Sequence, residues 1–235
     1  MQLALDHDRH TVSGMVTLPG DEQLADLRGT NDKGPARVEF DVADPDGTSA
    51  RIRSLNADIV ILAWWPHILK PQHLRLGQAV TLNLHPSLLP HGRGKDPNFW
   101  AIVEGSPFGV TIHHVMAEVD SGDIAFQREI AHGWEDTGQT LYERATTGIV
   151  ELFAECYPRI IAFDIPRQVQ QHAQGSFHKR SELDERSLMT LDGRHSIREI
   201  LNLLRARTFE PHPACRFRDG DATYEVRVTI RKTGD

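Results

Sequence analysis

The sequence contains little cysteine, few aromatic side chains and no excess of positive charge. Among 235 residues there are two cysteines, and aromatic residues make up 7%. Cys156 and Cys215 lack the number and spacing of a disulfide framework or a zinc site, so both classes are excluded. The net charge of −7 gives the whole molecule no electrostatic attraction to nucleic acid or to anionic lipid. An anionic ligand must therefore be bound by a local cluster of basic residues.

Long apolar runs and glycine-rich phosphate motifs are absent as well. No segment approaches the roughly 18 uninterrupted apolar residues of a membrane helix. We also find no signal peptide, in which a charged segment is followed by an apolar one, before the folded part. We therefore expect a soluble, cytoplasmic protein without membrane or nucleic-acid partners. The sequence has neither GxGxxG nor GxxxxGK[ST], which argues against a Rossmann-type NAD site and a P-loop.

Histidine is frequent, with 13 residues scattered along the chain. The densest group provides no compact set of three ligands on one helix; it consists of His85, His91, His113 and His114. We therefore expect no metal site, and we expect most histidines to be solvated or hydrogen-bonded within the fold.

Short β-branched or apolar runs alternate with helical patterns in the first part of the chain. These runs cover residues 10–18, 36–42, 58–64 and 79–84. The alternation predicts an α/β fold, with a mostly parallel, Rossmann-like sheet and flanking helices. The stretch 58–65 is nearly continuous in apolar residues, which predicts a central strand buried on both faces. Two further strands are predicted at 109–115 and 124–130, joined by a tight polar turn.

The predicted catalytic domain covers residues 1–165 and closes with a long amphipathic helix over 137–163, capped by Thr137. The segment 165–175 is polar and rich in glutamine and histidine, which predicts a linker.

A small C-terminal module is predicted over residues 175–235. It contains a helix over 196–207, which begins with a capping box of Ser196 and Glu199, and a β-hairpin with a strand over 223–231. Such a module buries too little apolar surface to fold alone, so it should pack on the first domain or on a second subunit. The hairpin alternates apolar and charged residues, and we expect a homodimer built through its apolar face.

One strand carries a pair of residues suited to catalysis. Residues two apart on a strand project to the same face, so Asn83 and His85 point together while Leu82 and Leu84 face the core. Pro86 ends the strand, which places the pair at the carboxyl edge where open α/β sheets bind ligands. An amide donor can stabilise a developing oxyanion, and an imidazole exchanges protons near neutral pH, so the pair suits acyl transfer. A structural capping role is the alternative.

Three segments together resemble a known catalytic domain. They are NLHPSLLP at 83–90, GVTIH at 109–113 and VDSGDI at 119–124. This pattern resembles the formyltransferase domain shared by glycinamide ribonucleotide, methionyl-tRNA and sugar-amine N-formyltransferases, over residues 55–165. The resemblance implies an Asn/His/Asp triad of Asn83, His85 and Asp120, with N10-formyltetrahydrofolate as the formyl donor.

The same resemblance implies a folate pocket. Its residues would be Trp65, His67, Leu69, Glu118 and Val119. Without the resemblance, Trp64 and Trp65 would be assigned to ordinary core packing.

Within the family, two segments are most similar to sugar N-formyltransferases: RGKDPNFW at 93–100 and NLLRARTFEP at 202–211. The likeness implies a dTDP-linked 4-amino-4,6-dideoxy sugar as acceptor, in some enzymes a 3-amino sugar, and is strongest to enzymes acting on the 4-amino glucose derivative. Asp96 before Pro97 predicts a helix cap, and nearby cations suit a diphosphate or a sugar hydroxyl. The expected substrate contacts are Arg93, Lys95, Asn98 and Arg207. A basic, solvated loop is the alternative for this stretch.

The chain departs from the family at its beginning. The first strand and its turn are shortened or missing, because the first strand-like run begins only near His10. A truncated start or a lost edge strand would explain this. Three alternative functions stay open: hydrolysis of formyltetrahydrofolate, formylation of glycinamide ribonucleotide, and a non-catalytic module binding folate or a nucleotide sugar. Transfer to methionyl-tRNA is disfavoured by the negative charge.

Overall fold

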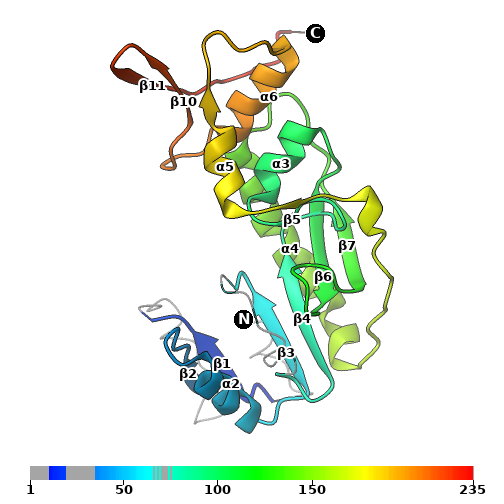
Figure 1. The fold of residues 1–235 in the computed structure, drawn as a ribbon. Coiled ribbons are helices and arrows are strands. Elements are labelled where there is room, and N and C mark those ends of the chain that lie inside the picture. The colour runs from blue at the N-terminus through cyan, green and yellow to red at the C-terminus, as the bar shows by residue number, and fades with distance from the viewer. Residues whose placement is uncertain are drawn as a thin grey trace.

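The structure is a computed structural model, and it describes residues 11–19, 35–65, 67, 69, 74 and 76–234. The predicted loss of the first strand concerns residues 1–10, which lie outside the described residues. The fold is α/β, as predicted (Figure 1). None of the described helices is both long and apolar enough to span a membrane.

The central sheet contains four strands in the order β3-β4-β6-β7. Their bounds are β3 Ile59–Ala63, β4 Val80–His85, β6 Gly109–His114 and β7 Ile124–Glu129. β3 pairs parallel with β4, whereas β6 pairs antiparallel with both β4 and β7. The prediction that residues 58–65 form the central, fully buried strand was wrong, because β3 lies at the end of this order and is half-buried. Every residue of β6 is buried, so β6 is the fully buried strand inside this sheet.

The main core lies between this sheet and two helices. Helix α4, Gly138–Ile161, packs on β6 and β7, and helix α3, Pro97–Glu104, packs on α4. Thr137 caps α4 as predicted, since its side chain accepts a hydrogen bond from the N–H of Thr140. Leu141, Ala145 and Ile149 lie one turn apart and are completely buried, which explains the amphipathic pattern.

The N-terminal part forms a smaller sheet and core. β1, Gly14–Thr17, pairs parallel with β2, Ala36–Glu39, and helix α2, Pro45–Ser54, packs beside β2. A second hydrophobic cluster contains Val38, Ile52 and Leu76, and Val60 of β3 packs against it. β3 therefore connects the two cores, which is why its first four residues are half-buried rather than exposed.

The C-terminal module contains two helices and a small sheet. Its elements are α5 Arg180–Arg186, β9 Leu188–Met189, α6 Ile197–Arg207, β10 Cys215–Asp219 and β11 Ala222–Val226. α6 begins with the predicted capping box of Ser196 and Glu199. The hairpin β10–β11 forms as expected, although its second strand ends at Val226 instead of residue 231. Leu203, Leu204 and Ala206 of α6 belong to the main core and pack against α3 and α4.

The segment predicted as a linker is not a free connection. Residues 168–172, which we call the bracing segment, lie along the loop 118–124 between β6 and β7, where Gln168 and Ile124 exchange backbone hydrogen bonds. The 3₁₀ turn η3, His172–Gln174, and strand β8, Phe177–His178, follow. β8 pairs parallel with β5, Arg93–Gly94. The loop before α3 is thus held by residues far along the chain.

Candidate active site

The end of β4 presents two polar side chains on one face. Leu82 and Leu84 are buried in the main core, while Asn83 and His85 project to the other side, as the alternation of a strand predicts. His85 is the last residue of β4, and Pro86 follows it. The pair therefore lies at the edge of the sheet, next to the loop that follows β6.

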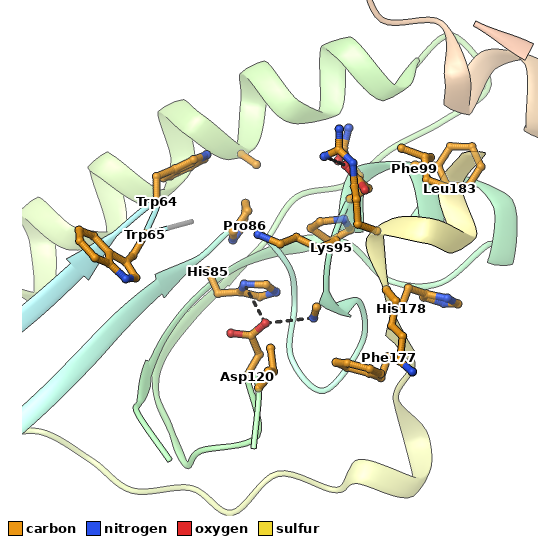
Figure 2. A pocket seen from close by; sticks show the side chains of 18 of the residues that line it. Trp64, Trp65, His85, Pro86, Lys95, Phe99, Asp120, Phe177, His178 and Leu183 are labelled. Carbon is orange, nitrogen blue, oxygen red and sulfur yellow. Dashed lines mark hydrogen bonds and ion pairs between the residues drawn. The ribbon is translucent and has the colours of Figure 1, made fainter. Parts of the chain in front are cut away.

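Asp120 connects these two side chains. Its Oδ1 atom accepts a hydrogen bond of 3.3 Å from the Asn83 amide, and its Oδ2 atom lies 3.6 Å from His85 Nδ1. The backbone N–H of Gly94 also donates to Oδ2, at 3.0 Å. The structure thus brings together the three residues expected to form the triad, and Figure 2 shows the His85–Asp120 contact.

The hydrogen bonds of His85 determine which nitrogen holds its proton. Nε2 lies 3.0 Å from the carbonyl oxygen of Gly92, which only accepts, so Nε2 carries the hydrogen. In the neutral ring the lone pair of Nδ1 then faces Asp120. Burial lowers the pKa of His85, although the charge of Asp120 partly opposes this effect. The ring is therefore neutral near pH 7, with a free basic nitrogen beside a carboxylate.

Asp120 is ionised throughout the neutral range. Burial alone raises the pKa of its carboxyl, but His85, His113 and the N–H of Gly94 outweigh burial and hold the pKa well below its usual range. A proton that reaches His85 Nδ1 is therefore stabilised by a neighbouring negative charge.

A single cleft of about 980 Å³ contains this site. One part of its wall consists of Leu62, Trp64, Trp65, His67, Leu69, Leu74 and residues 115–119. Another part consists of residues 94–99 before and within α3, residues 177–180 around β8, residues 206–207 at the end of α6, and residues 209–213 after it. In the view of Figure 2 the tryptophans lie on one side of the His85–Asp120 pair, and Phe177 and His178 lie on the other. The cleft therefore offers two walls of different chemistry on either side of the polar cluster.

Comparison with known proteins identifies the fold and the family. A family model described as formyl transferase matches residues 18–156, more than half of the chain. The chain belongs to the formyl transferase family. A second model, described as N-formyltransferase dimerization C-terminal domain, matches residues 182–232. The family resemblance expected from the sequence is thereby confirmed.

Solved structures agree with this assignment. The formyltransferase PseJ from Anoxybacillus kamchatkensis is 32% identical, with 73% of this chain and 89% of that chain covered and a TM-score of 0.59. A sugar N-formyltransferase from a Shewanella species is 22% identical, with 86% and 80% covered and a TM-score of 0.76. An N-formyltransferase from Helicobacter canadensis is 23% identical, with 60% and 51% covered and a TM-score of 0.53.

Residues predicted to bind folate line this formyltransferase's cleft together. Trp65, His67 and Leu69 follow β3, and Glu118 and Val119 directly precede Asp120. The rings of Trp65 and His67 pack edge to face, 5.8 Å apart. The Nε1 atom of Trp65 is buried and has no hydrogen-bond partner among the described residues. An apolar wall with a donor that no described residue uses fits a flat heterocycle that carries acceptor atoms.

The four residues predicted to bind the acceptor of the formyltransferase differ in placement. Lys95 and Arg207 line the cleft, and Arg207 is only 8% exposed, with its Nε unpartnered in the described part of the chain. Asn98 also lies at the wall, but its amide donates to the Gly138 carbonyl at 2.8 Å and is thus engaged within the protein. Arg93 is not among the described residues that line the cleft.

The expected cap of α3 by Asp96 was wrong. Asp96 occupies the N-cap position, but its φ of 56° is left-handed and its side chain makes no capping hydrogen bond. Its carboxylate instead lies 3.5 Å from Arg180, and burial raises its pKa. Left-handed backbone at the cap turns the side chain away from the first N–H groups of the helix.

Sequence reasoning missed His113 as a site residue of the formyltransferase. Its Nδ1 donates to the carbonyl of His114 at 2.9 Å, which leaves Nε2 to accept from the Asn83 amide at 3.1 Å. His113 pairs directly with Asn83 in the β4–β6 register, and only that register brings them together. Within the described ranges, no three His, Cys, Asp or Glu side chains form a metal-binding group.

Proposed function

We propose that this formyltransferase moves a formyl group from N10-formyltetrahydrofolate to the amine of a nucleotide-linked amino sugar, namely a dTDP-linked 4-amino-4,6-dideoxy sugar. The observation that carries the proposal is the Asp120 carboxylate, which joins Asn83 and the basic Nδ1 of His85 between two chemically different walls of one cleft. An oxyanion donor, a proton acceptor and room for two substrates are what formyl transfer between nitrogens requires.

In the proposed reaction the neutral sugar amine attacks the formyl carbon, and a carbon–nitrogen bond forms. The carbonyl oxygen becomes an oxyanion, toward which the Asn83 amide turns one of its N–H groups. The amine loses a proton to His85 Nδ1, and Asp120 stabilises the imidazolium. The His85 imidazolium then gives this proton to the folate nitrogen, while the oxyanion re-forms the carbonyl double bond and the bond between that nitrogen and the formyl carbon breaks. Holding both substrates in one cleft supplies roughly 7 kcal/mol or more of the rate enhancement.

Folate and nucleotide sugars are bound by relatives. The Anoxybacillus enzyme was crystallised with UDP-4,6-dideoxy-4-formamido-L-AltNAc and tetrahydrofolate, and the Helicobacter enzyme with folinic acid and dTDP-3-aminofucose. We assign the folate to the wall of Trp65, His67 and Leu69. We assign the diphosphate to the wall of Lys95 and Arg207. The Arg207 guanidinium is buried and lies 3.4 Å from Asp184, but its Nε has no partner among the described residues, which favours an anion in an otherwise acidic protein.

A homodimer is part of the proposal. The region matched by the dimerization model carries exposed apolar side chains, namely Leu188, Leu191, Ile197, Ile200 and Tyr224. Exposed apolar groups gathered in one module favour association with a second copy.

The proposal is tested by incubating the protein with N10-formyltetrahydrofolate and a panel of amines: dTDP- and UDP-linked 3-amino and 4-amino dideoxy sugars, and glycinamide ribonucleotide. We expect tetrahydrofolate to form only with an amino sugar, and the product to gain one formyl group by mass spectrometry. Consumption of the donor at the same rate without any amine would establish a hydrolase instead. Binding of both ligands without turnover would establish a non-catalytic module.

A further inference from the structure

The bracing segment contacts the Asp120 loop at every second residue. Gln168 exchanges backbone hydrogen bonds with Ile124, the Gln170 side chain contacts two carbonyls of the loop, and His172 Nε2 lies 3.1 Å from the carbonyl of Ser121. An extended chain presents alternate residues to one side, so residues 168, 170 and 172 all face the loop.

Gln170 makes the central contact of this series. Its Nε2 donates to the carbonyl of Asp120 at 2.9 Å and to the carbonyl of Gly122 at 2.6 Å. The residue is 6% exposed, while its neighbour Gln171 is exposed. Resting on the proposed function, we propose that Gln170 is a positioning residue of the reaction, which fixes the backbone of Asp120 so that its carboxylate meets Asn83 and His85.

The backbone of the loop 118–124 is strained, so contacts such as those of Gln170 are required to stabilise its conformation. Asp120 has a φ of 50°, a left-handed conformation that costs a residue other than glycine about 1 kcal/mol or more. The turn is also tight, since a Cβ on Gly122 would lie 1.7 Å from the carbonyl oxygen of His114. One amide group that binds the carbonyls on both sides of Ser121 holds this turn in a single shape.

The cost of burying Gln170 supports the same role. Its Oε1 atom is buried and has no hydrogen-bond partner among the described residues, and an unsatisfied buried polar atom costs about 1–3 kcal/mol. An apolar side chain would avoid that cost but would deprive the carbonyls of Asp120 and Gly122 of this donor. The stabilising part of the interaction therefore comes from the two N–H groups of the Gln170 amide, both of which donate to carbonyls of the Asp120 loop.

Two variants and one matched control test the inference. Gln170→Met keeps the length of the side chain and removes both donors, and Gln170→Glu keeps its shape and replaces donors with acceptors. Gln171→Glu introduces the same charge one residue away, on an exposed side chain. Steady-state kinetics with the amine that the wild type uses gives kcat and KM separately. Amide hydrogen exchange of the peptide 118–124, read by mass spectrometry, reports on the loop without any substrate.

We expect both Gln170 variants to lose about 10-fold to 100-fold in kcat, because small displacements of a catalytic group are costly, with the KM for the amine little changed. Exchange in 118–124 should be faster than in the wild type, and Gln171→Glu should match the wild type in both measurements. Wild-type kcat or unchanged loop exchange in Gln170→Met would overturn the inference, and this variant decides the matter if Gln170→Glu does not fold. If the wild type formylates no amine, the proposed function fails, whereas loop exchange still shows whether Gln170 fixes the loop.

Discussion

His85 Nδ1 lies 3.6 Å from Oδ2 of Asp120, while Nε2 of the same ring lies 3.0 Å from the carbonyl of Gly92. The carbonyl fixes the proton on Nε2 and leaves the basic lone pair directed at the carboxylate. A proton taken up at Nδ1 is therefore stabilised by Asp120, and in the proposed reaction the departing folate nitrogen receives it from there.

The pH dependence of kcat follows from this pair. Burial lowers the pKa of His85 below its ordinary value of 6.5, so kcat should hold as the pH falls through that value and decline only below it. Asp120→Asn removes a charge that raises the His85 pKa. The variant should be less active, and the acidic decline of its kcat should occur at lower pH than in the wild type. A pH profile of kcat for both proteins checks this. A limb that moves to higher pH in the variant would refute the assigned coupling.

Stability should change in the same pH range. The pKa of His85 is lower in the folded protein than in the unfolded chain. The neutral ring therefore stabilises the fold above pH 6.5, and this stabilisation is lost as the pH falls from 6.5 toward the folded pKa. Asp120, with its pKa also lowered, adds a loss at more acidic pH. We expect the free energy of unfolding, measured by urea titration, to decrease from neutral pH downward, and less steeply just below 6.5 in His85→Gln.

Two asparagines should give opposite results when truncated. Asn83→Ala removes the proposed oxyanion donor and should lower kcat on the order of 10²-fold to 10³-fold. Asn98→Ala removes the hydrogen bond to Gly138 and should lower the free energy of unfolding by about 1–3 kcal/mol with kcat nearly unchanged. Turnover and urea unfolding of both variants check this. Unaltered turnover in Asn83→Ala would contradict the catalytic assignment.

Gly94 links β8 to Asp120. Its φ is 90°, and a Cβ there would lie 2.2 Å from the carbonyl oxygen of His178. Gly94→Ala should therefore push β5 from β8, withdraw the N–H from Asp120 and lower kcat about 10-fold or more.

Gly105→Ala is the matched control, since Gly105 has a φ of 65° but open space around its Cα. It should cost about 1 kcal/mol of backbone strain and no activity. Equal losses of kcat in the two variants would show that strain alone is responsible.

The oligomer should depend on the C-terminal module. Ile197 is 77% exposed at the start of α6, and Val150 is 63% exposed on α4, outside that module. We expect a dimer by analytical ultracentrifugation, which Ile197→Asp weakens and Val150→Asp leaves intact, because a charge in an apolar interface is costly. A monomeric wild type at micromolar concentration would exclude the proposed homodimer.

Sequence reasoning found the parts of the site that local rules determine. The alternation of β4 and the position of Pro86 placed Asn83 and His85 on one face, and the motif added Asp120. His113 was missed because an antiparallel register, not a spacing along the chain, brings it to Asn83.

The structure differs from the expectations where tertiary contacts override composition. Residues 165–175 have the composition of a linker, yet Gln170 is buried against the Asp120 loop. Asp96 before Pro97 has the pattern of a helix cap, but its left-handed backbone prevents that bond. Residues 58–65 are apolar enough for a central strand, but Ile59 and Ile61 pack against one hydrophobic cluster and Val60 against the other.

The partners of Asp120 lie far apart along the chain, from Asn83 to Gln170, and β8 begins only at Phe177. During translation, the growing polypeptide contains the complete triad well before it contains the residues that brace it. The bracing segment and β8 must emerge from the ribosome before Asp120 acquires its final environment. Ribosome-bound chains that end just after Asp120 should therefore be inactive although they contain the triad. Activity should begin only in chains long enough to include the bracing segment and β8.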